Sequence, residues 1–425
     1  MPVFTSSIEL SDDYPSVEPS LKLNFAGSRS LDPCITFTRS SVGTYVGRDG
    51  LIKTAGNNEP RFDHDPETLE SLGLLIEEEK TNLIVNSVIN TANWNNSASQ
   101  LLNNTSETKA PDGTNTACKY IPNNGSIGWV SVYNTGNVIS MTSGTTYTYS
   151  VWAKPTHSDF TGFRINGDIR DAGGINISAN FVLSGDGSVS GTYDSASITK
   201  YPNGWYRCVA TGTADATTNE EPAFQTSASG DGTKGFYAWG YQVEVGVFAT
   251  SYIPTSGSSV TRTYDNAEII GENFTNNFNT LEGTFVAECD RGNDGTEGAG
   301  IGAMRALTNS YFDMIQFGEF YDNAGATGRV YIGGTSQAQI GATHTTGQGV
   351  YNRYAFAYKK DSFAGAINGV GQGEDTSGNV PTILVKFLFG GYDDNRATQN
   401  LDGHIKYFYY YPKRLTNAQL QLLTA

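Results

Sequence analysis

The chain is poor in charged residues and histidine, and it contains no long apolar run. Charged residues make up 16% of its 425 residues, against about 25% in an average globular protein, which argues against coiled coils, helical bundles and disordered chains. No apolar run approaches the roughly 20 residues that a helix needs to span a bilayer. Membrane insertion is therefore not expected.

Cysteine is also scarce, and its spacing excludes the usual cysteine-built scaffolds. The four cysteines, Cys34, Cys118, Cys208 and Cys289, lie too far apart for a zinc site or a disulfide framework. Buried thiols are expected, with a Cys118–Cys208 bridge as the alternative. Residues 1–17 contain neither a basic region nor an apolar core, so a Sec signal peptide is not expected.

What the chain has in abundance is glycine, tyrosine, phenylalanine and acidic residues. It contains 49 Gly, 24 Tyr and 21 Phe, and its formal net charge is −16. An acidic surface repels phosphate backbones, which excludes nucleic acid as an expected partner. Neutral glycans or another protein fit this composition better.

Short apolar runs separated by Gly, Asn and Asp turns predict an all-β protein. Residues 43–55 predict a hairpin, because Asp49-Gly50 lies between two apolar runs. The tail predicts a helical turn that packs through Leu415, Leu420 and Leu423. The pattern predicts three β-rich parts with boundaries near residues 90 and 263, the middle one a sandwich or jelly roll.

Three stretches resemble known families. Residues 35–84 resemble an N-terminal module of structural proteins from tailed bacteriophages and prophages, and residues 248–265 resemble the strand and linker that close the next module in those proteins. Residues 110–120, 202–212 and 237–246 look like parts of a carbohydrate-binding jelly roll. Residues 401–425 are similar to the last strand and tail of concanavalin A-like (laminin G-type) lectin sandwiches. The resemblances imply an N-terminal β-rich docking module (1–90), a β-jelly-roll sandwich (91–263) and a C-terminal concanavalin A-like β-sandwich (264–425).

These resemblances imply a virion component that touches the host surface, such as a tail fibre, tail tip or head spike. The implied location is the virion, assembled in the bacterial host cytoplasm. The implied partners are host cell-surface polysaccharide and other virion proteins. A homo-oligomer is implied, of which a trimer is the usual form in fibres.

Sugar binding needs flat aromatic faces together with a few planar polar groups. Trp129 and Tyr133 share one face if residues 129–133 form a strand, and Arg164 and Asn166 share a face in the next strand. Arginine suits paired contacts with carboxylates or hydroxyls. The alternative for each pair is a solvated face. Trp152 and Trp239 lie in apolar runs and are expected in the core, and the resemblance to jelly rolls implies a structural role for Trp205 near Arg207.

The loop at residues 390–396 of the predicted C-terminal sandwich supplies further candidate glycan contacts, because recognition residues usually lie in such loops. These contacts are Tyr392, Asn395 and Arg396.

Calcium is the one cofactor that the acidic loops could hold, because its ligands are hard oxygens. Asp393 and Asp394 offer such oxygens in the loop at residues 390–396. The resemblance to jelly rolls adds Asp112 and Glu244, at positions that often hold a structural calcium ion in that family. The alternatives are an Asx turn at Asp112 and an edge carboxylate at Glu244.

Catalytic motifs are missing from the sequence. It contains no His-Glu-x-x-His, Gly-x-Ser-x-Gly or phosphate-loop pattern. Glu288 and Asp290 are spaced like two members of the carboxylate strand of concanavalin A-like glucanases, but the third carboxylate of that motif is absent. We therefore expect no enzymatic activity.

The expected function is non-catalytic adhesion of a phage virion protein to host-surface glycans. A purely structural fibre or decoration subunit is the first alternative. A polysaccharide depolymerase is the second alternative.

Overall fold

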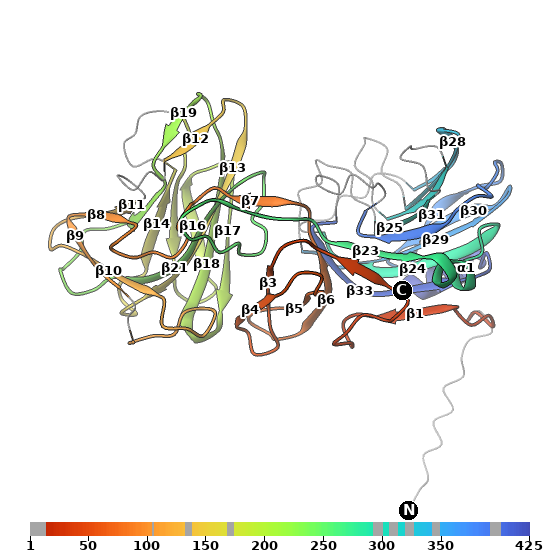
Figure 1. Ribbon diagram of the computed structural model, residues 1–425, viewed down its shortest axis with the longest axis horizontal. Coiled ribbons are helices and arrows are strands. Elements are labelled where there is room, and N and C mark those ends of the chain that lie inside the picture. Colours follow the sequence, from red (N-terminus) through yellow and green to blue (C-terminus); the bar gives the residue numbers. More distant parts are fainter. Residues whose placement is uncertain are drawn as a thin grey trace, which may run out of the picture. The chain divides into compact units, whose positions relative to one another are not determined.

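The computed structural model describes residues 14–103, 106–131, 138–167, 174–291, 301–305, 313–318, 327–341, 349–391 and 401–425. In these ranges nearly all regular structure is β-strand, with two short α-helices, α1 (Gly271–Asn277) and α2 (Asn417–Thr424) (Figure 1). Neither described helix has the length and apolar character needed to cross a membrane. The predicted all-β class, built from sandwich sheets, is confirmed.

The chain divides into two compact units. One contains residues 39–71 and 79–263 and is called the middle unit; the other contains residues 14–38, 72–78 and the chain from residue 264 onward and is called the terminal unit. The residues of the predicted N-terminal module are thus shared between both units.

Two six-stranded antiparallel sheets form the middle unit. The first, called the β13 sheet, has the order β17 (Ser195–Tyr201), β18 (Trp205–Thr213), β13 (Thr146–Pro155), β21 (Phe236–Val245), β10 (Cys118–Pro122), β9 (Ser99–Leu102). The second, called the β14 sheet, has the order β16 (Ser188–Thr192), β15 (Ser178–Val182), β14 (Gly162–Asn166), β20 (Ala223–Thr226), β11 (Trp129–Ser131), β8 (Asn95–Ser97).

Smaller pieces complete the middle unit. They are the pairs β3 (Gly43–Val46) with β4 (Ile52–Ala55), β7 (Lys80–Asn82) with β22 (Val260–Arg262) and β12 (Ile139–Met141) with β19 (Thr218–Glu220), together with β5 (Phe62–His64) and the 3-10 turn Pro202–Gly204. The predicted hairpin at residues 43–55 is confirmed as β3–β4. Of its Asp49-Gly50 pair, Gly50 alone has a positive φ, +73°, because the turn is longer than two residues and Gly47 N donates to Leu51 O.

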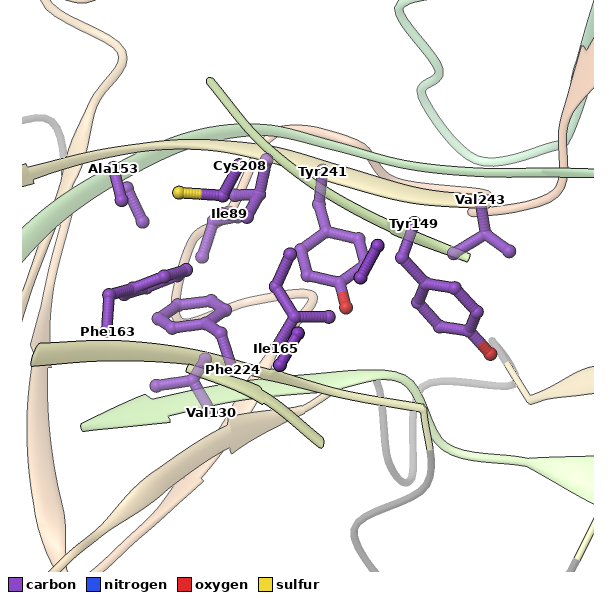
Figure 2. Packing of buried hydrophobic residues seen from close by; sticks show 14 of the residues in the cluster. Ile89, Val130, Tyr149, Ala153, Phe163, Ile165, Cys208, Phe224, Tyr241 and Val243 are labelled. Atoms are coloured by element: carbon purple, nitrogen blue, oxygen red, sulfur yellow. The ribbon is translucent and has the colours of Figure 1, made fainter. Parts of the chain in front are cut away.

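Alternating side chains from the two sheets meet in an aromatic-rich core (Figure 2). Phe163 and Ile165 of β14 are fully buried in it. Phe224 of β20 lies at its centre, with its ring centroid 5.6 Å from that of Phe163 and 6.1 Å from that of Trp94. The period-2 pattern that predicted strands is therefore also the pattern that divides core from surface.

The terminal unit is a second two-sheet sandwich. Its first sheet, called the β24 sheet, contains β31 (Val370–Asp375), β30 (Phe363–Ile367), β29 (Asn352–Lys359), β24 (Glu282–Cys289), β33 (Gly403–Tyr411) and β6 (Ser71–Ile76), with β1 (Leu21–Asn24) also on β33. Its second sheet has the order β2 (Thr36–Thr38), β23 (Asn266–Ile270), β32 (Lys386–Phe389), β25 (Gly302–Arg305), β26 (Met314–Phe317), β27 (Gly328–Ile332), β28 (Thr335–Ile340).

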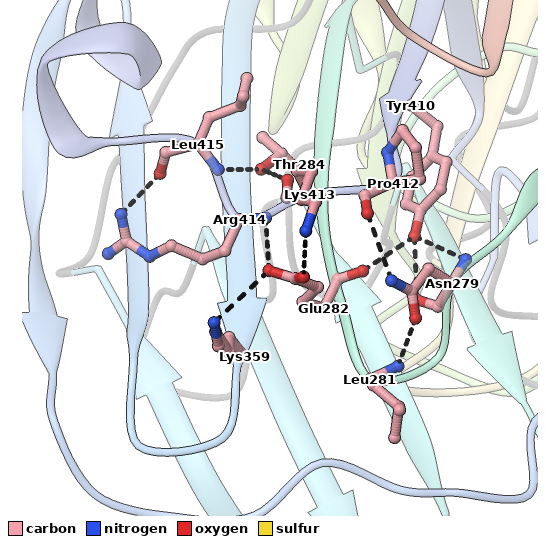
Figure 3. Close-up of polar contacts among 10 residues, drawn as sticks. All are labelled: Asn279, Leu281, Glu282, Thr284, Lys359, Tyr410, Pro412, Lys413, Arg414 and Leu415. Carbon is pink, nitrogen blue, oxygen red and sulfur yellow. Dashed lines mark hydrogen bonds and ion pairs between the residues drawn. The ribbon is translucent and has the colours of Figure 1, made fainter. Parts of the chain in front are cut away.

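The chain after β33 is fixed to the start of β24 by side-chain hydrogen bonds (Figure 3). Thr284 Oγ1 donates to Lys413 O at 2.8 Å and accepts from Leu415 N at 3.0 Å. Glu282 forms an ion pair with Lys413 at 3.0 Å. Helix α2 then begins at the capping box of Thr416, with Leu420 fully buried and Leu423 packed at the edge of the same cluster. The predicted C-terminal helical turn is confirmed.

All four cysteines are free thiols. Cys118, Cys208 and Cys289 are buried, whereas Cys34 is half-buried. The alternative Cys118–Cys208 bridge is therefore not present. Burial raises the pKa of the Cys118 thiol to about 12, which keeps it protonated and unreactive at neutral pH.

Replacing Phe224 should destabilise the middle unit strongly. Phe224→Ala removes a ring that four other aromatic side chains contact, and the expected loss in free energy of unfolding is about 3–5 kcal/mol. All five tryptophans lie in the middle unit, so tryptophan fluorescence during urea unfolding reports on that unit. The matched control is Val182→Ala, an exposed position of the same sheet, and an equal effect of both changes would contradict this core.

Candidate functional site

The outward face of the β13 sheet is covered by the middle unit's own chain. Trp152, Trp205 and Trp239 lie on it and are at most 3% exposed. They form one cluster with Val46 and Ile52 of the β3–β4 hairpin. The prediction that these three tryptophans are core residues is confirmed, and their rings are covered by the chain.

The opposite surface of the middle unit, the outward face of the β14 sheet, is polar. Val130, Phe163, Phe224 and Phe181 are fully buried and point into the core. Because side chains alternate along a strand, the residues between them point outward.

Strand pairing aligns the outward residues in one cross-strand row, called the β14 row. From β8 to β16 its members are Ser97, Trp129, Gln225, Arg164, Asn180 and Ser190. Trp129 and Arg164 both pair with Gln225, from opposite sides. Adjacent strands lie about 4.8 Å apart, which separates the backbones of Trp129 and Arg164 by about 9.6 Å.

The sequence placed Trp129 on one face of its strand and Arg164 with Asn166 on one face of another, and the structure brings them onto the same surface. Asn166 lies one row further along β14, opposite Ala223 of β20, and is 8% exposed. Ser131, two residues after Trp129, is also opposite Ala223. Gln225, between Trp129 and Arg164 in the row, is 9% exposed, and Ser131 is fully buried. The surface is therefore recessed at Gln225, Ser131 and Asn166 and more open at Trp129, Arg164 and Asn180.

Two members of the row, Gln225 and Asn180, were missed from the sequence. The alternation in SANFV (178–182) does mark Asn180 as an outward residue, whereas AFQT (223–226) does not alternate and gives no such signal for Gln225. What the sequence lacks is the strand order, because β20 follows β14 by more than 50 residues and yet lies beside it.

Arg164 is positioned by a neutral neighbour. Its Nε donates to Asn180 Oδ1 at 2.6 Å. This hydrogen bond fixes one edge of the guanidinium group and leaves the two Nη nitrogens for a ligand. Trp129 is half-buried. A half-buried indole and a fixed planar donor group on one surface can hold a ring that is apolar on one side and carries oxygen acceptors at its rim.

Several predicted residues lie outside the described parts of the chain. They are Tyr133, Tyr392, Asp393, Asp394, Asn395 and Arg396. Their roles in glycan or calcium binding remain predictions.

The two calcium candidates that the structure does describe are held by local hydrogen bonds. Asp112 Oδ1 accepts from Thr114 N at 2.9 Å and from Thr114 Oγ1 at 2.7 Å, which is an Asx turn. Glu244 is fully buried in the central strand β21, not at an edge, and its carboxylate accepts from Thr250 N at 3.1 Å and from the Thr250 hydroxyl. Within the described residues, no group of three or more His, Cys, Asp and Glu side chains is arranged around a metal position.

The carboxylates considered for glycosidase chemistry are tied to neighbouring side chains. Glu288 pairs with Arg353 at 3.0 Å and with Lys406 at 3.4 Å. Asp290 accepts from His404 N at 2.5 Å and lies 3.0 Å from His404 Nδ1. Each carboxylate thus has a structural partner that accounts for its position.

Comparisons with known proteins return fold-level likenesses. No family model and no curated protein matches the chain. Solved structures with some likeness include domain 4 of the extracellular GH43 arabinanase AbnA from Geobacillus stearothermophilus, in complex with arabinotriose (12% identity, 42% of this chain and 82% of that one, TM-score 0.31). Another is the CBM40 of the Ruminococcus gnavus IT-sialidase (14% identity, 35% and 84%, TM-score 0.29). A third is the Trypanosoma rangeli sialidase (10% identity, 72% and 60%, TM-score 0.29). Likenesses of this size do not place the chain in a family.

The buried carboxyl of Glu244 should give the middle unit a measurable pH dependence. Burial raises the pKa of Glu244 above its ordinary value of 4.5, so the folded state favours the protonated form. Its stabilising contribution is present below pH 4.5 and is lost as the pH rises through the raised pKa.

Glu244→Gln should therefore make the free energy of unfolding decline less steeply above pH 4.5. The slope should change by at most the value for one bound proton, about 1.4 kcal/mol per pH unit. Urea unfolding followed by tryptophan fluorescence from pH 4 to 8 measures this difference. Parallel pH profiles for the wild-type protein and the variant would show that Glu244 ionises normally.

Proposed function

We propose that the chain is a non-catalytic adhesion protein that binds host-surface saccharide on the outward face of the β14 sheet. The observation that carries the proposal is the β14 row, which aligns Trp129, Gln225 and Arg164 on three adjacent strands. Pyranose rings stack their C–H faces on indole, and amide and guanidinium groups donate to their hydroxyls. The separation of about 9.6 Å between Trp129 and Arg164 accommodates more than one sugar ring.

The absence of catalysis is part of this proposal. A glycosidase needs two carboxyl groups facing each other across a bound sugar. In this chain Glu288 and Asp290 are engaged by Arg353, Lys406 and His404, and the β14 row itself contains no carboxylate. Binding without cleavage is the behaviour that this arrangement favours.

The proposal also assigns the chain to the virion of a phage. It is supported by the resemblance of residues 35–84 to the N-terminal module of tailed-phage structural proteins. A single saccharide site on one sheet face should be weak. Many copies of the chain on one particle, as a homo-oligomer docked to other virion proteins, would raise the overall avidity through effective concentration.

Trp129→Ala should weaken saccharide binding at least tenfold without unfolding the protein. The experiment mixes purified protein with host-surface polysaccharide and follows both by size-exclusion chromatography with light scattering. The wild-type protein should co-elute with polymer of unchanged length, whereas the variant should elute alone. Tyr409→Ala, which removes a half-buried aromatic side chain of the terminal unit, is the matched control.

Three results would count against this function. Shortened polymer would demonstrate catalysis. Equal co-elution of wild-type protein and Trp129→Ala would place the saccharide elsewhere. Independent elution of protein and intact polymer would favour a purely structural subunit.

The virion location has its own test. Antibodies raised against the purified chain should label particles released from the host by immunogold electron microscopy, and the label should gather at one position on each particle. Label confined to particle-free host fractions would contradict a virion role and leave the saccharide site to be tested by itself.

A further inference from the structure

The β14 sheet differs from the rest of this acidic chain in its charges. The chain carries 43 acidic residues, yet none of the six strands of this sheet contains an aspartate or a glutamate. Arg164 is the one charged residue in these six strands. Among the strand residues of this sheet, the single charge is thus positive, in a protein whose net charge is −16.

Three lysines elsewhere in the middle unit are paired with acids, whereas Lys109 donates to the neutral amide of Asn115 and Lys154 to the hydroxyl of Thr108. Lys119 lies 2.7 Å from Glu107, Lys200 lies 2.6 Å from Glu67, and Lys234 lies 2.6 Å from Asp159. Arg164 instead has the neutral amide of Asn180 as its hydrogen-bond partner. Gln225 is the β20 neighbour of Arg164, and the nearest described carboxylate before Gln225 in the sequence belongs to Glu221. These two residues are four positions apart, or about 13 Å in an extended strand.

The geometry at Arg164 suits a planar anion. Asn180 holds the Nε edge of the guanidinium, and the remaining Nη nitrogens form a planar fork that matches a carboxylate. A neutral diol would be served equally well by an amide such as Gln225. The guanidinium of Arg164 differs from an amide in its positive charge, which favours a negatively charged ligand. No acidic residue of the six strands neutralises this charge.

Resting on the function proposed above, we propose that the β14 row takes a saccharide that bears a carboxylate, a uronate or a sialate. Its carboxylate lies at the Nη edge of Arg164, Gln225 donates to a hydroxyl between, and a neighbouring sugar ring stacks on Trp129. The acidic remainder of the chain repels densely charged polymers, so isolated acidic sugars between neutral ones are the preferred form.

Two matched pairs of probes test this proposal by isothermal titration calorimetry on the full chain. The first pair is a hexasaccharide of alternating glucuronate and N-acetylglucosamine, and the same hexasaccharide with each carboxylate reduced to a hydroxymethyl group. The second pair is sialyllactose and lactose. The wild-type protein should bind the acidic member of at least one pair tenfold or more tighter than its neutral member, and which pair does so separates uronate from sialate.

Variants identify the residue responsible. Arg164→Gln should bring the acidic-to-neutral affinity ratio to near one, because the acidic member loses far more affinity than the neutral member, and Arg164→Lys should restore part of the ratio. Lys234→Gln, which removes an ion-paired cation of the same unit, is the control and should leave the ratio unchanged. Raising NaCl from 50 to 300 mM should weaken acidic-saccharide binding more than neutral binding.

The outcomes separate the two proposals. Equal affinity for acidic and neutral members, or an unchanged ratio in Arg164→Gln, would overturn the carboxylate proposal while leaving saccharide binding intact. Binding of no member of either pair by a protein that also fails to bind host polysaccharide would overturn both.

Discussion

Burial of the Trp152 cluster under the β3–β4 hairpin is the interaction on which the middle unit's function depends. The Trp152 and Trp239 rings meet edge to face with centroids 5.4 Å apart, and Tyr252 lies 4.7 Å from Trp239. Arg207 covers the remaining ring face of Trp152, 4.7 Å from its centroid, and donates to Thr250 O at 2.6 Å. These aromatic side chains therefore hold the β3–β4 hairpin and the segment around Tyr252 against the sandwich. They are not available to stack on a ligand.

Because the β3–β4 hairpin packs on the β13 sheet, the two outward faces of the sandwich differ in their exposed side chains. The β13 sheet gives its large aromatic side chains to the hairpin contact, whereas the β14 sheet keeps a half-buried tryptophan beside amides and a single arginine. The core between them is rigid, because aromatic rings from both sheets interlock around Phe224. A site built on the strands of such a sheet holds its side chains at fixed spacings, which is what recognition of a saccharide requires.

Local pattern was enough to predict the strands, the β3–β4 hairpin, the C-terminal helix and the burial of Trp152, Trp205 and Trp239. Alternation also placed Trp129 and Arg164 on exposed faces. What no local pattern contains is which strands are neighbours, so the sequence could not show that Gln225 lies between these two residues or that Asn180 holds Arg164. For the same reason it could not show that β1, β2 and β6 join a sandwich formed mostly by residues after 264.

Glu244 illustrates the opposite case, in which a resemblance suggested a ligand role that the surroundings explain otherwise. Its position resembles one that often holds calcium in carbohydrate-binding jelly rolls, but the structure gives its carboxylate two donors from Thr250. The segment that carries Thr250 is also the one bound by Arg207. Glu244 therefore helps to fix the segment that covers the β13 sheet.

The central claim is that saccharide binds the outward face of the β14 sheet. Hydrogen–deuterium exchange of the full chain, with and without host polysaccharide, tests it directly because it compares every strand in one experiment. The account predicts that added polysaccharide slows exchange in residues 129–131, 162–166 and 223–226 and leaves β24 and β33 unchanged. Slower exchange confined to β24 and β33, with none in the β14 sheet, would contradict it.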